Sequence, residues 1–157
     1  MATDDPEIPI RWARGPEDAR GAFAVRERVF CEEQGVPREQ ELDERDADAL
    51  HLVALDPEGR LVIGTLRLLV DADRAKVGRV AVEREWRRRG IAALMLELAL
   101  SRARELGCVQ VRLAAQLAAT SVYRRAGFAV ESEPFEEAGI QHVWMGQTLA
   151  PSDPAGA

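Results

Sequence analysis

Three arginines stand where a long helix is predicted to begin, although cations are unfavourable at a helix start. The run at residues 87–90 reads Arg-Arg-Arg-Gly, and apolar residues at helical spacing follow it. A helix N-terminus has a partial positive charge and free N–H groups, so arginines there suit a bound anion. Gly90 would let a phosphate come close to the backbone. A second interpretation stays open, in which the arginines form a solvated cluster balanced by Glu83 and Glu85.

The composition is that of a soluble globular protein with one core. The chain has 157 residues, of which 46% are hydrophobic and 31% charged, and this is the usual length of one domain. A formal net charge of -6 argues against general binding to nucleic acid or to acidic membrane surfaces. The acidic start does not resemble a signal peptide, and no apolar run is long enough to span a membrane. We therefore expect a cytoplasmic protein with no nucleic-acid or membrane partner.

The two cysteines give no sign of a disulfide framework or a metal site. Cys31 and Cys108 are far apart in the chain and lack metal-ligand spacing. Nothing near Cys31 in the sequence indicates a lowered thiol pKa. We expect both side chains to be reduced and packed in the interior.

Strand and helix patterns alternate along the chain and must position the arginines. Strands are predicted at residues 8–13, 49–55, 60–70, 75–82, 108–115, 128–132 and 142–149, and helices at residues 16–35, 91–107 and 118–127. This order predicts one mixed α/β (α+β) domain over residues 8–149, with a seven-stranded sheet and helices on both faces. Residues 1–7 are expected to be a flexible start and residues 150–157 a disordered tail.

Two motifs give the chain a family resemblance. Arg87-x-x-Gly90-x-Ala92, between the strand VGRVAV and a long apolar helix, resembles the acyl-CoA pyrophosphate loop of the GNAT superfamily of N-acetyltransferases. The segment SVYRRAGF, residues 121–128, resembles that family's Y-x-x-x-G-F segment. The stretches VRERVFCEEQGVP, ELDERD, HLVAL and GIQHVWM resemble its ElaA-like branch, so nearly the whole folded chain is covered. The resemblance implies a mostly antiparallel sheet that splays between its fourth and fifth strands.

The same resemblance implies acetyl-CoA as co-substrate and no metal. In the family, the strand before the loop offers main-chain groups to the pantetheine arm, and N–H groups of the loop hold the pyrophosphate. The matching positions here are Val80, Ala81 and Val82 on the strand and Arg87, Arg88, Arg89, Gly90, Ile91, Ala92 and Ala93 in the loop. Gln116 is also expected beside the pantetheine, although many members have an asparagine there, and Ala92 replaces a second glycine.

Tyr123 matches the tyrosine that protonates the coenzyme A thiolate in many members of the family. It is the only tyrosine in the sequence. Its structural alternative is an aromatic side chain on a helix face, half buried against the sheet. The motif favours the catalytic role.

The acceptor side needs a group that takes a proton from the attacking amine. Carboxylates and histidines are the candidates, and the set comprises Glu33, Glu41, Asp43, Glu44, His51 and His142, with Glu41, Asp43 and His142 favoured. Each has a structural alternative, as a solvated acid or a hydrogen-bonding histidine. The acidic arm, residues 37–48, is expected to concentrate a cationic amine. Arg26 either meets a carboxylate on the acceptor or pairs with this arm.

The sequence thus predicts an acetyl-CoA-dependent N-acetyltransferase in which a small-molecule primary amine, or an exposed amino group, attacks the thioester directly. The alternative is a non-catalytic acyl-CoA-binding sensor or partner subunit. An exposed edge on the final strand could also pair with a second copy of the chain, which would give a homodimer.

Overall fold

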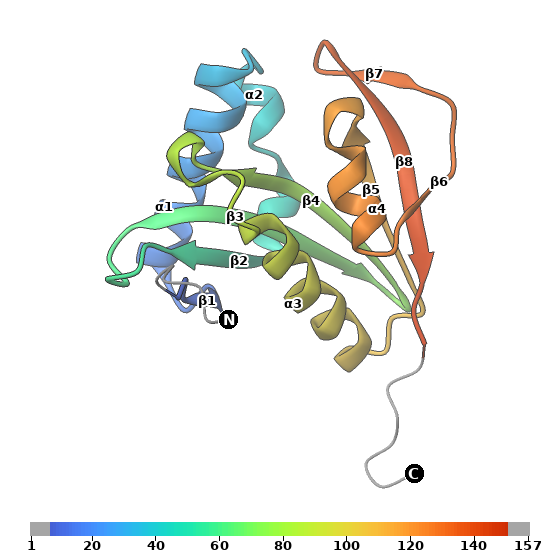
Figure 1. The fold of residues 1–157 in the computed structure, drawn as a ribbon, viewed down its shortest axis with the longest axis horizontal. Helices are drawn as coiled ribbons and strands as arrows, with labels where there is room; N and C mark the ends of the chain where they lie inside the picture. The colour runs from blue at the N-terminus through green and yellow to red at the C-terminus, as the bar shows by residue number, and fades with distance from the viewer. Residues whose placement is uncertain (1–6, 151–157) are drawn as a thin grey trace, which may run out of the picture.

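One mixed β-sheet organises residues 7–150, the part of the chain that the computed structural model describes (Figure 1). Its strands are β1 (Ile10–Trp12), β2 (Leu50–Leu55), β3 (Val62–Asp71), β4 (Arg74–Val82), β5 (Gln110–Gln116), β6 (Ala129–Val130), β7 (Phe135–Glu137) and β8 (Ile140–Thr148). They are hydrogen-bonded in the order β1-β2-β3-β4-β5-β8-β6, and β7 also pairs with β8. Only β4 and β5 pair in parallel within this sheet. The mixed, mostly antiparallel sheet predicted from the sequence is confirmed.

Helices cover both faces of the sheet, as predicted. They are α1 (Pro16–Arg26), α2 (Arg38–Glu41), α3 (Ile91–Glu105) and α4 (Thr120–Arg125), joined by a π-helix η1 (Glu27–Glu33) and the 3-10 turns η2 (Glu44–Ala47), η3 (Arg84–Trp86) and η4 (Leu117–Ala119). Figure 1 shows α3 and α4 on one face, with α1 and α2 on the other. The main core lies between the sheet and α3, where Met95, Leu96 and Ala99 are fully buried. A smaller cluster packs Val25 and Val29 against β4.

The sheet splays open between β4 and β5, at the predicted place. The two strands pair only through Arg74, Ala75 and Lys76, whose partners are Gln110, Val111 and Arg112. Beyond Lys76 the strands diverge, so β5 leaves the later main-chain groups on that edge of β4 without a strand partner. The splay opens a space in the middle of the sheet.

The acidic arm and the segment before β8 contain short elements that the sequence analysis did not predict. The arm forms α2 and η2, each four residues long. Strand β7 pairs with β8 through a two-residue turn at Ala138 and Gly139, both with positive φ, 51° and 77°. Such a turn lets two short strands pair, although the segment EEAG reads as a loop.

The edge of β8 differs from the expectation. One side of β8 pairs with β5, and β6 and β7 pair along the other side. The final strand therefore presents no free edge of the kind we expected to support a homodimer.

The predicted flexible start (1–7) and disordered tail (150–157) lie almost entirely outside the described residues 7–150. In that described part, no helix combines the length and the apolar character needed to cross a membrane.

Candidate active site

The start of α3 has the geometry that suits an anion. Gly90 is the N-cap residue with φ 78°, and Arg88 is also left-handed with φ 64°. The N–H of Leu94 donates to the Gly90 carbonyl at 3.1 Å, so the N–H groups of residues 91–93 lack the usual partner one turn earlier in the helix. The first turn carries no acid, and no side chain of residues 7–150 caps it. The free N–H groups and the positive end of the helix dipole both favour a negatively charged ligand at this position.

Two of the three arginines beside this helix start already have partners. Arg87 donates through Nη1 and Nη2 to the two carboxylate oxygens of Glu33, each at 2.7 Å, and through Nε to the Val82 carbonyl at 2.9 Å. This pair lowers the pKa of Glu33. The guanidinium of Arg89 lies 4.7 Å from the centroid of the Trp86 ring. The acid that anchors Arg87 is Glu33, not Glu83 or Glu85 as the second interpretation expected, and Glu83 pairs with Arg28 instead. The N–H groups beside Arg87 stay open.

A groove of about 1010 Å³ runs along α3 and α4 next to this helix start. It brings together most of the predicted cofactor residues, namely Val80, Val82, Arg87, Arg88, Arg89, Gly90, Ile91, Ala92, Ala93 and Tyr123. Ala81 and Gln116 lie outside the groove and line a second cavity. We call this space the cofactor groove.

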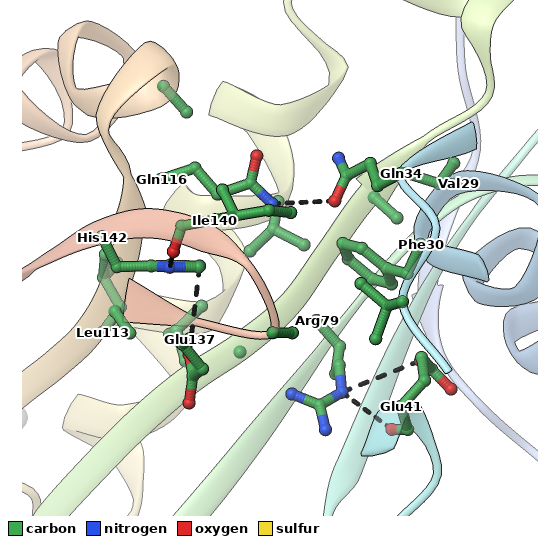
Figure 2. A pocket seen from close by; sticks show the side chains of 18 of the residues that line it. Val29, Phe30, Gln34, Glu41, Arg79, Leu113, Gln116, Glu137, Ile140 and His142 are labelled. Carbon is green, nitrogen blue, oxygen red and sulfur yellow. Dashed lines mark hydrogen bonds and ion pairs between the residues drawn. The ribbon is translucent and has the colours of Figure 1, made fainter. Parts of the chain in front are cut away.

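The second cavity, of about 500 Å³, lies in the splay between β4 and β5 (Figure 2). We call it the acceptor cavity. It shares five lining residues with the cofactor groove, which are Val80, Val82, Arg87, Ala119 and Tyr123. Across it, the Gln116 amide of β5 donates to the Gln34 side-chain oxygen at 2.9 Å, joining the two walls. The two spaces therefore meet in the middle of the sheet, at Tyr123.

Tyr123 sits at this junction with its phenol kept neutral. The residue is only 8% exposed, and burial raises the pKa of its hydroxyl to about 12. The ring packs edge-to-face on Phe128, with the two centroids 6.3 Å apart. A phenol with that pKa is protonated at neutral pH, so it can donate a proton.

His142 presents a free ring nitrogen to the acceptor cavity (Figure 2). Its Nδ1 lies 2.7 Å from the Ile140 carbonyl, which can only accept, so Nδ1 carries the hydrogen in the neutral ring. Nε2 then keeps a lone pair, and the Glu137 carboxylate lies 3.9 Å from it. Nε2 is therefore the ring nitrogen of His142 that can accept a proton, and it faces the Glu137 carboxylate.

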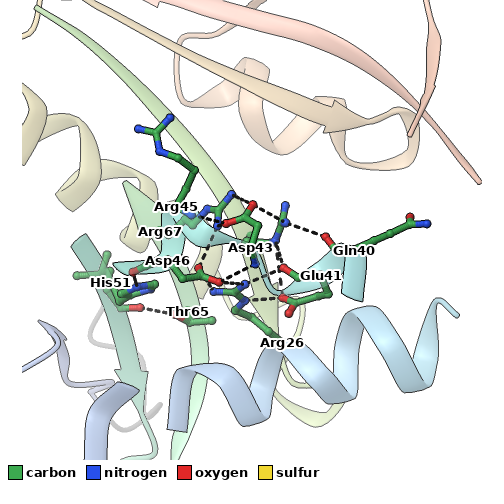
Figure 3. A network of polar contacts seen from close by, with 11 residues as sticks. Arg26, Gln40, Glu41, Asp43, Arg45, Asp46, His51, Thr65 and Arg67 are labelled. Carbon is green, nitrogen blue, oxygen red and sulfur yellow. Dashed lines mark hydrogen bonds and ion pairs between the residues drawn. The ribbon is translucent and has the colours of Figure 1, made fainter. Parts of the chain in front are cut away.

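Three acids of the acidic arm, Glu41, Asp43 and Asp46, are held by arginines (Figure 3). Arg26, only 1% exposed, pairs with the carboxylates of Glu41 and Asp46. Arg67 binds both carboxylate oxygens of Asp43, at 2.7 and 2.9 Å. The open alternative for Arg26 is thereby decided, because it pairs with the arm.

The charges in this network balance. Its three arginines, at positions 26, 67 and 79, face three acids, at positions 41, 43 and 46. The hydrogen bonds and charge of Arg67 lower the pKa of Asp43, so its carboxylate binds protons weakly. Glu41 and Asp43 are thus engaged by cations, whereas His142 is not.

Comparison with known proteins decides the family. A family model for the acetyltransferase (GNAT) domain matches residues 17–149. The chain belongs to the GNAT superfamily. It is 34% identical over 134 residues to YjcF of Bacillus subtilis, an uncharacterized N-acetyltransferase, and the match covers 85% of this chain and 94% of the relative.

Solved structures agree with this GNAT assignment. An acyl-CoA N-acyltransferase from Pseudomonas aeruginosa is 28% identical, with a TM-score of 0.76 over 90% of this chain and 99% of that one. ElaA from Escherichia coli shares the fold, with a TM-score of 0.79, 22% identity, and coverage of 90% of this chain and 99% of that one. The protein is an acyl-CoA-dependent N-acyltransferase.

Other candidates in this GNAT domain lie away from the acceptor cavity. Glu33 pairs with Arg87, and Glu44 is exposed at the surface. His51 contacts the Asp46 carbonyl through Nε2 at 3.0 Å on the far side of the ion-pair network. Cys108 is packed in the core as predicted, whereas Cys31 is only partly buried. Desolvation raises the pKa of both thiols. No group of three or more His, Cys, Asp or Glu in residues 7–150 could hold a metal ion.

Four charged residues of the acceptor cavity were missed by the sequence analysis, namely Arg67, Lys76, Arg79 and Glu137. Arg67 could have been identified from the sequence, because a charged residue in the middle of the apolar strand VIGTLRLLV predicts a buried ion pair. Glu137 could not, since it lies in the short strand β7. Lys76 and Arg79 read as ordinary polar positions of a strand.

Proposed function

We propose that this protein transfers an acetyl group from acetyl-CoA to a primary amine by direct attack. The observation that carries the proposal is the position of Tyr123, which lines both the cofactor groove and the acceptor cavity. A thioester entering from the groove and an amine entering from the cavity would meet beside its phenol.

In this proposal the start of α3 holds the coenzyme. The N–H groups from Arg88 to Ala93 bind the pyrophosphate oxygens, in the manner of an anion at a helix N-terminus. Main-chain groups of Val80, Ala81 and Val82, on the open edge of β4, bind the pantetheine arm, with Gln116 on the facing strand. This is the arrangement that the family resemblance implied.

The reaction needs one proton to leave and one to arrive. The amine nitrogen attacks the thioester carbonyl carbon, the C–S bond breaks, and the thiolate takes the proton of the Tyr123 hydroxyl. The proton lost by the amine goes to Nε2 of His142, directly or through water, with Glu137 beside the imidazolium. Solvent then returns a proton to the phenolate. Glu41 and Asp43 act here as positioning residues, because their carboxylates hold arginines of the cavity wall.

An acceptor that arrives as an ammonium ion first loses one proton to solvent and then attacks as the neutral amine, and Glu137 is the cavity carboxylate that the incoming cation would meet beside His142. The cytoplasmic location and the homodimer stay predictions from the sequence, and the paired edges of β8 lend the homodimer no support.

The proposal is tested by comparing the wild type with Tyr123→Phe, using release of the coenzyme A thiol from acetyl-CoA and a panel of primary amines. The variant keeps the ring against Phe128 and loses only the hydroxyl. We expect kcat to fall about 100-fold, the usual scale for a general acid, with an unchanged Kd for acetyl-CoA. Since Tyr123 is the only tyrosine, an alkaline ultraviolet titration of the wild type reports on it alone and should show a pKa of about 12.

Two results would contradict the proposal. Full kcat in Tyr123→Phe would move the proton donor elsewhere. Binding of acetyl-CoA without thiol release for any amine would favour the acyl-CoA-binding sensor instead.

A further inference from the structure

One wall of the acceptor cavity carries cationic donors that the reaction above does not use. Arg67 of β3 and Lys76 and Arg79 of β4 line the cavity around Gly78, which is the register partner of Arg67. The carboxylates that line the same cavity are Glu41 and Glu137. Glu41 is held by Arg26 and contacts Arg79, so it is not available to all of these donors.

Arg67 has a buried donor without an acceptor. Its side chain is 5% exposed, and its Nη1 and Nη2 bind Asp43 and Asp46. Its Nε, in contrast, is buried and finds no hydrogen-bond partner among residues 7–150. An unpartnered buried donor is costly, so this nitrogen calls for an acceptor atom from outside the chain.

Gly78 leaves the room for such an atom. A Cβ built at Gly78 would meet one heavy atom within 4 Å, which is Nε of Arg67 at 3.8 Å. A side chain at this position would occupy the space in front of the unpartnered nitrogen. Gly78 therefore leaves beside this nitrogen a space that the Cβ of any other residue would fill. We call this space the glycine notch.

Arg79 adds a second donor at the same wall (Figure 2). It lies at a break in the β3–β4 register, with a φ of 53° that is uncommon for a side chain other than glycine. Its Nε and Nη2 contact the Glu41 and Gln40 carbonyls and Asp43, which leaves Nη1 unpaired within the described chain. Burial, with Arg67 and Arg26 nearby, lowers the pKa of Arg79, so its charged form would be stabilised by an anion.

Lys76 completes the cluster. Lys76 lies two residues before Gly78 on β4, and its Nζ is 5.2 Å from the centroid of the Trp144 ring. Partial desolvation lowers the pKa of this ammonium group. An anion bound beside it would raise that pKa again. The cavity that contains Gly78 is thus lined by three cations from two neighbouring strands.

We propose that Arg67, Lys76 and Arg79 form a carboxylate-binding subsite, so the acceptor is an amino acid rather than a simple amine. The carboxylate accepts from Arg67 Nε and Arg79 Nη1 at the glycine notch, and the amine lies toward His142 and Glu137. This inference rests on the proposed acetyl transfer to amines. The sequence predicted that the acidic arm attracts a cationic amine. This inference instead has the cavity recognise a zwitterion, because the arm's acids in the network are already paired with arginines.

The test uses the twenty L-amino acids, β-alanine and 4-aminobutyrate. Each compound is compared with the carboxamide made from it, which lacks the negative charge. Acetyl transfer is measured with the wild type, and binding of the same probes to the coenzyme A complex is measured by calorimetry. We expect kcat/KM and affinity to be about tenfold higher for at least one amino acid than for its carboxamide. This is the scale of one charge-assisted hydrogen bond.

Variants assign that preference to the subsite. Lys76→Gln and Arg79→Gln should each lower the acid-to-amide ratio about fivefold or more, within the range of one lost charged contact. Gly78→Ala should also lower it, and the added methyl makes only ordinary contact, so the fold is kept. Arg60→Gln is the matched control, because Arg60 is exposed in the turn before β3 and lines neither cavity.

The outcomes separate the two proposals. Equal rates for acids and amides would overturn the subsite while leaving the proposed function intact. Acids that bind in a Lys76-dependent way, with no acetyl transfer to any probe, would support the subsite and overturn the proposed function. An acid preference that survives both Lys76→Gln and Arg79→Gln would overturn the subsite.

Discussion

The cofactor groove and the acceptor cavity meet at Tyr123, yet the groove is shaped mainly by the backbone of one segment and the cavity by side chains from several segments. The groove is formed mainly by one continuous stretch, residues 86–94, whose glycine and free N–H groups shape the site. The acceptor cavity is formed by side chains from distant segments, including Gln34, Glu41, Arg67 and Glu137. Backbone geometry can bind a constant ligand such as a pyrophosphate, whereas side chains can be varied to select an acceptor.

The two regions also differ in how they handle charge. At the start of α3 the free N–H groups add to a cluster of three arginines, of which only Arg87 is paired with a carboxylate of residues 7–150, and no acid lies in the first turn. Around the acceptor cavity, by contrast, the arginines are matched by acids, and one buried donor of Arg67 is left over. The cofactor groove thus favours an anion through its overall positive charge, while the acceptor cavity offers a few hydrogen-bond donors at fixed positions.

If the groove binds acetyl-CoA through its backbone, Gly90→Glu should have the largest effect of any single change. No heavy atom of the described chain lies within 4 Å of a Cβ at Gly90, so the new carboxylate would project into open space beside the pyrophosphate. Juxtaposed like charges cost several kcal/mol, so we expect acetyl-CoA affinity to fall about 1000-fold by calorimetry.

Gly59→Glu is the matched control for that experiment. Gly59 has a φ of 72°, close to the 78° of Gly90, and a Cβ there also meets nothing within 4 Å. It lies before β3 and lines neither cavity. Backbone strain is therefore similar in the two variants, and equal acetyl-CoA affinity in both would place the coenzyme elsewhere.

The groove could be predicted from the sequence because its parts are adjacent in the chain. The arginine run, Gly90 and the apolar helix were read together, and the structure places nearly all of the predicted cofactor residues along one groove. The mixed sheet followed from the order of strand and helix patterns, and the splay followed from the family resemblance. Strand β7 escaped prediction because its three residues carry too short a pattern.

The acceptor cavity could not be predicted to the same depth, because its polar groups meet only in the folded chain. Glu41 and Asp43 were predicted as candidate bases, and in the structure Glu41 lines the cavity while Asp43 does not. Both carboxylates are paired with arginines that come from α1, β3 and β4. Sequence patterns show a charge without showing its partner. The acidic arm therefore looked like a source of negative field, although arginines neutralise the three of its acids that lie in the ion-pair network.

At the acceptor side, His142→Gln should lower kcat about 100-fold, because the lone pair that accepts the amine proton is lost. The Kd for acetyl-CoA should not change, since His142 lines only the acceptor cavity. His51→Gln is the control, as His51 lines neither space. Steady-state kinetics with a fixed amine measures both variants, and equal losses of kcat would remove His142 as the specific base.

The smallest effect concerns the ion pairs that hold the acceptor wall. Burial raises the pKa of Asp46, but hydrogen bonds and charge from Arg26 and Arg67 outweigh it and lower the pKa from 3.8 to about 2. A carboxyl whose pKa is lowered by folding binds protons more weakly in the native state. Its contribution is complete above about pH 4 and is lost as the pH falls toward 2. The shift corresponds to about 2 kcal/mol of unfolding free energy.

Urea unfolding between pH 6 and pH 2 measures this contribution when the wild type is compared with Asp46→Asn. Other carboxyls whose pKa is lowered by an arginine, such as Asp18 and Glu33, titrate in both proteins and cancel in the difference. The wild type should therefore lose about 2 kcal/mol more than the variant as the pH falls from about 4 to 2. Parallel stability curves would mean that the arginines do not hold Asp46 in its charged form. The acceptor wall would then depend on apolar packing and backbone geometry, as the cofactor groove does, and the contrast between the two regions would be lost.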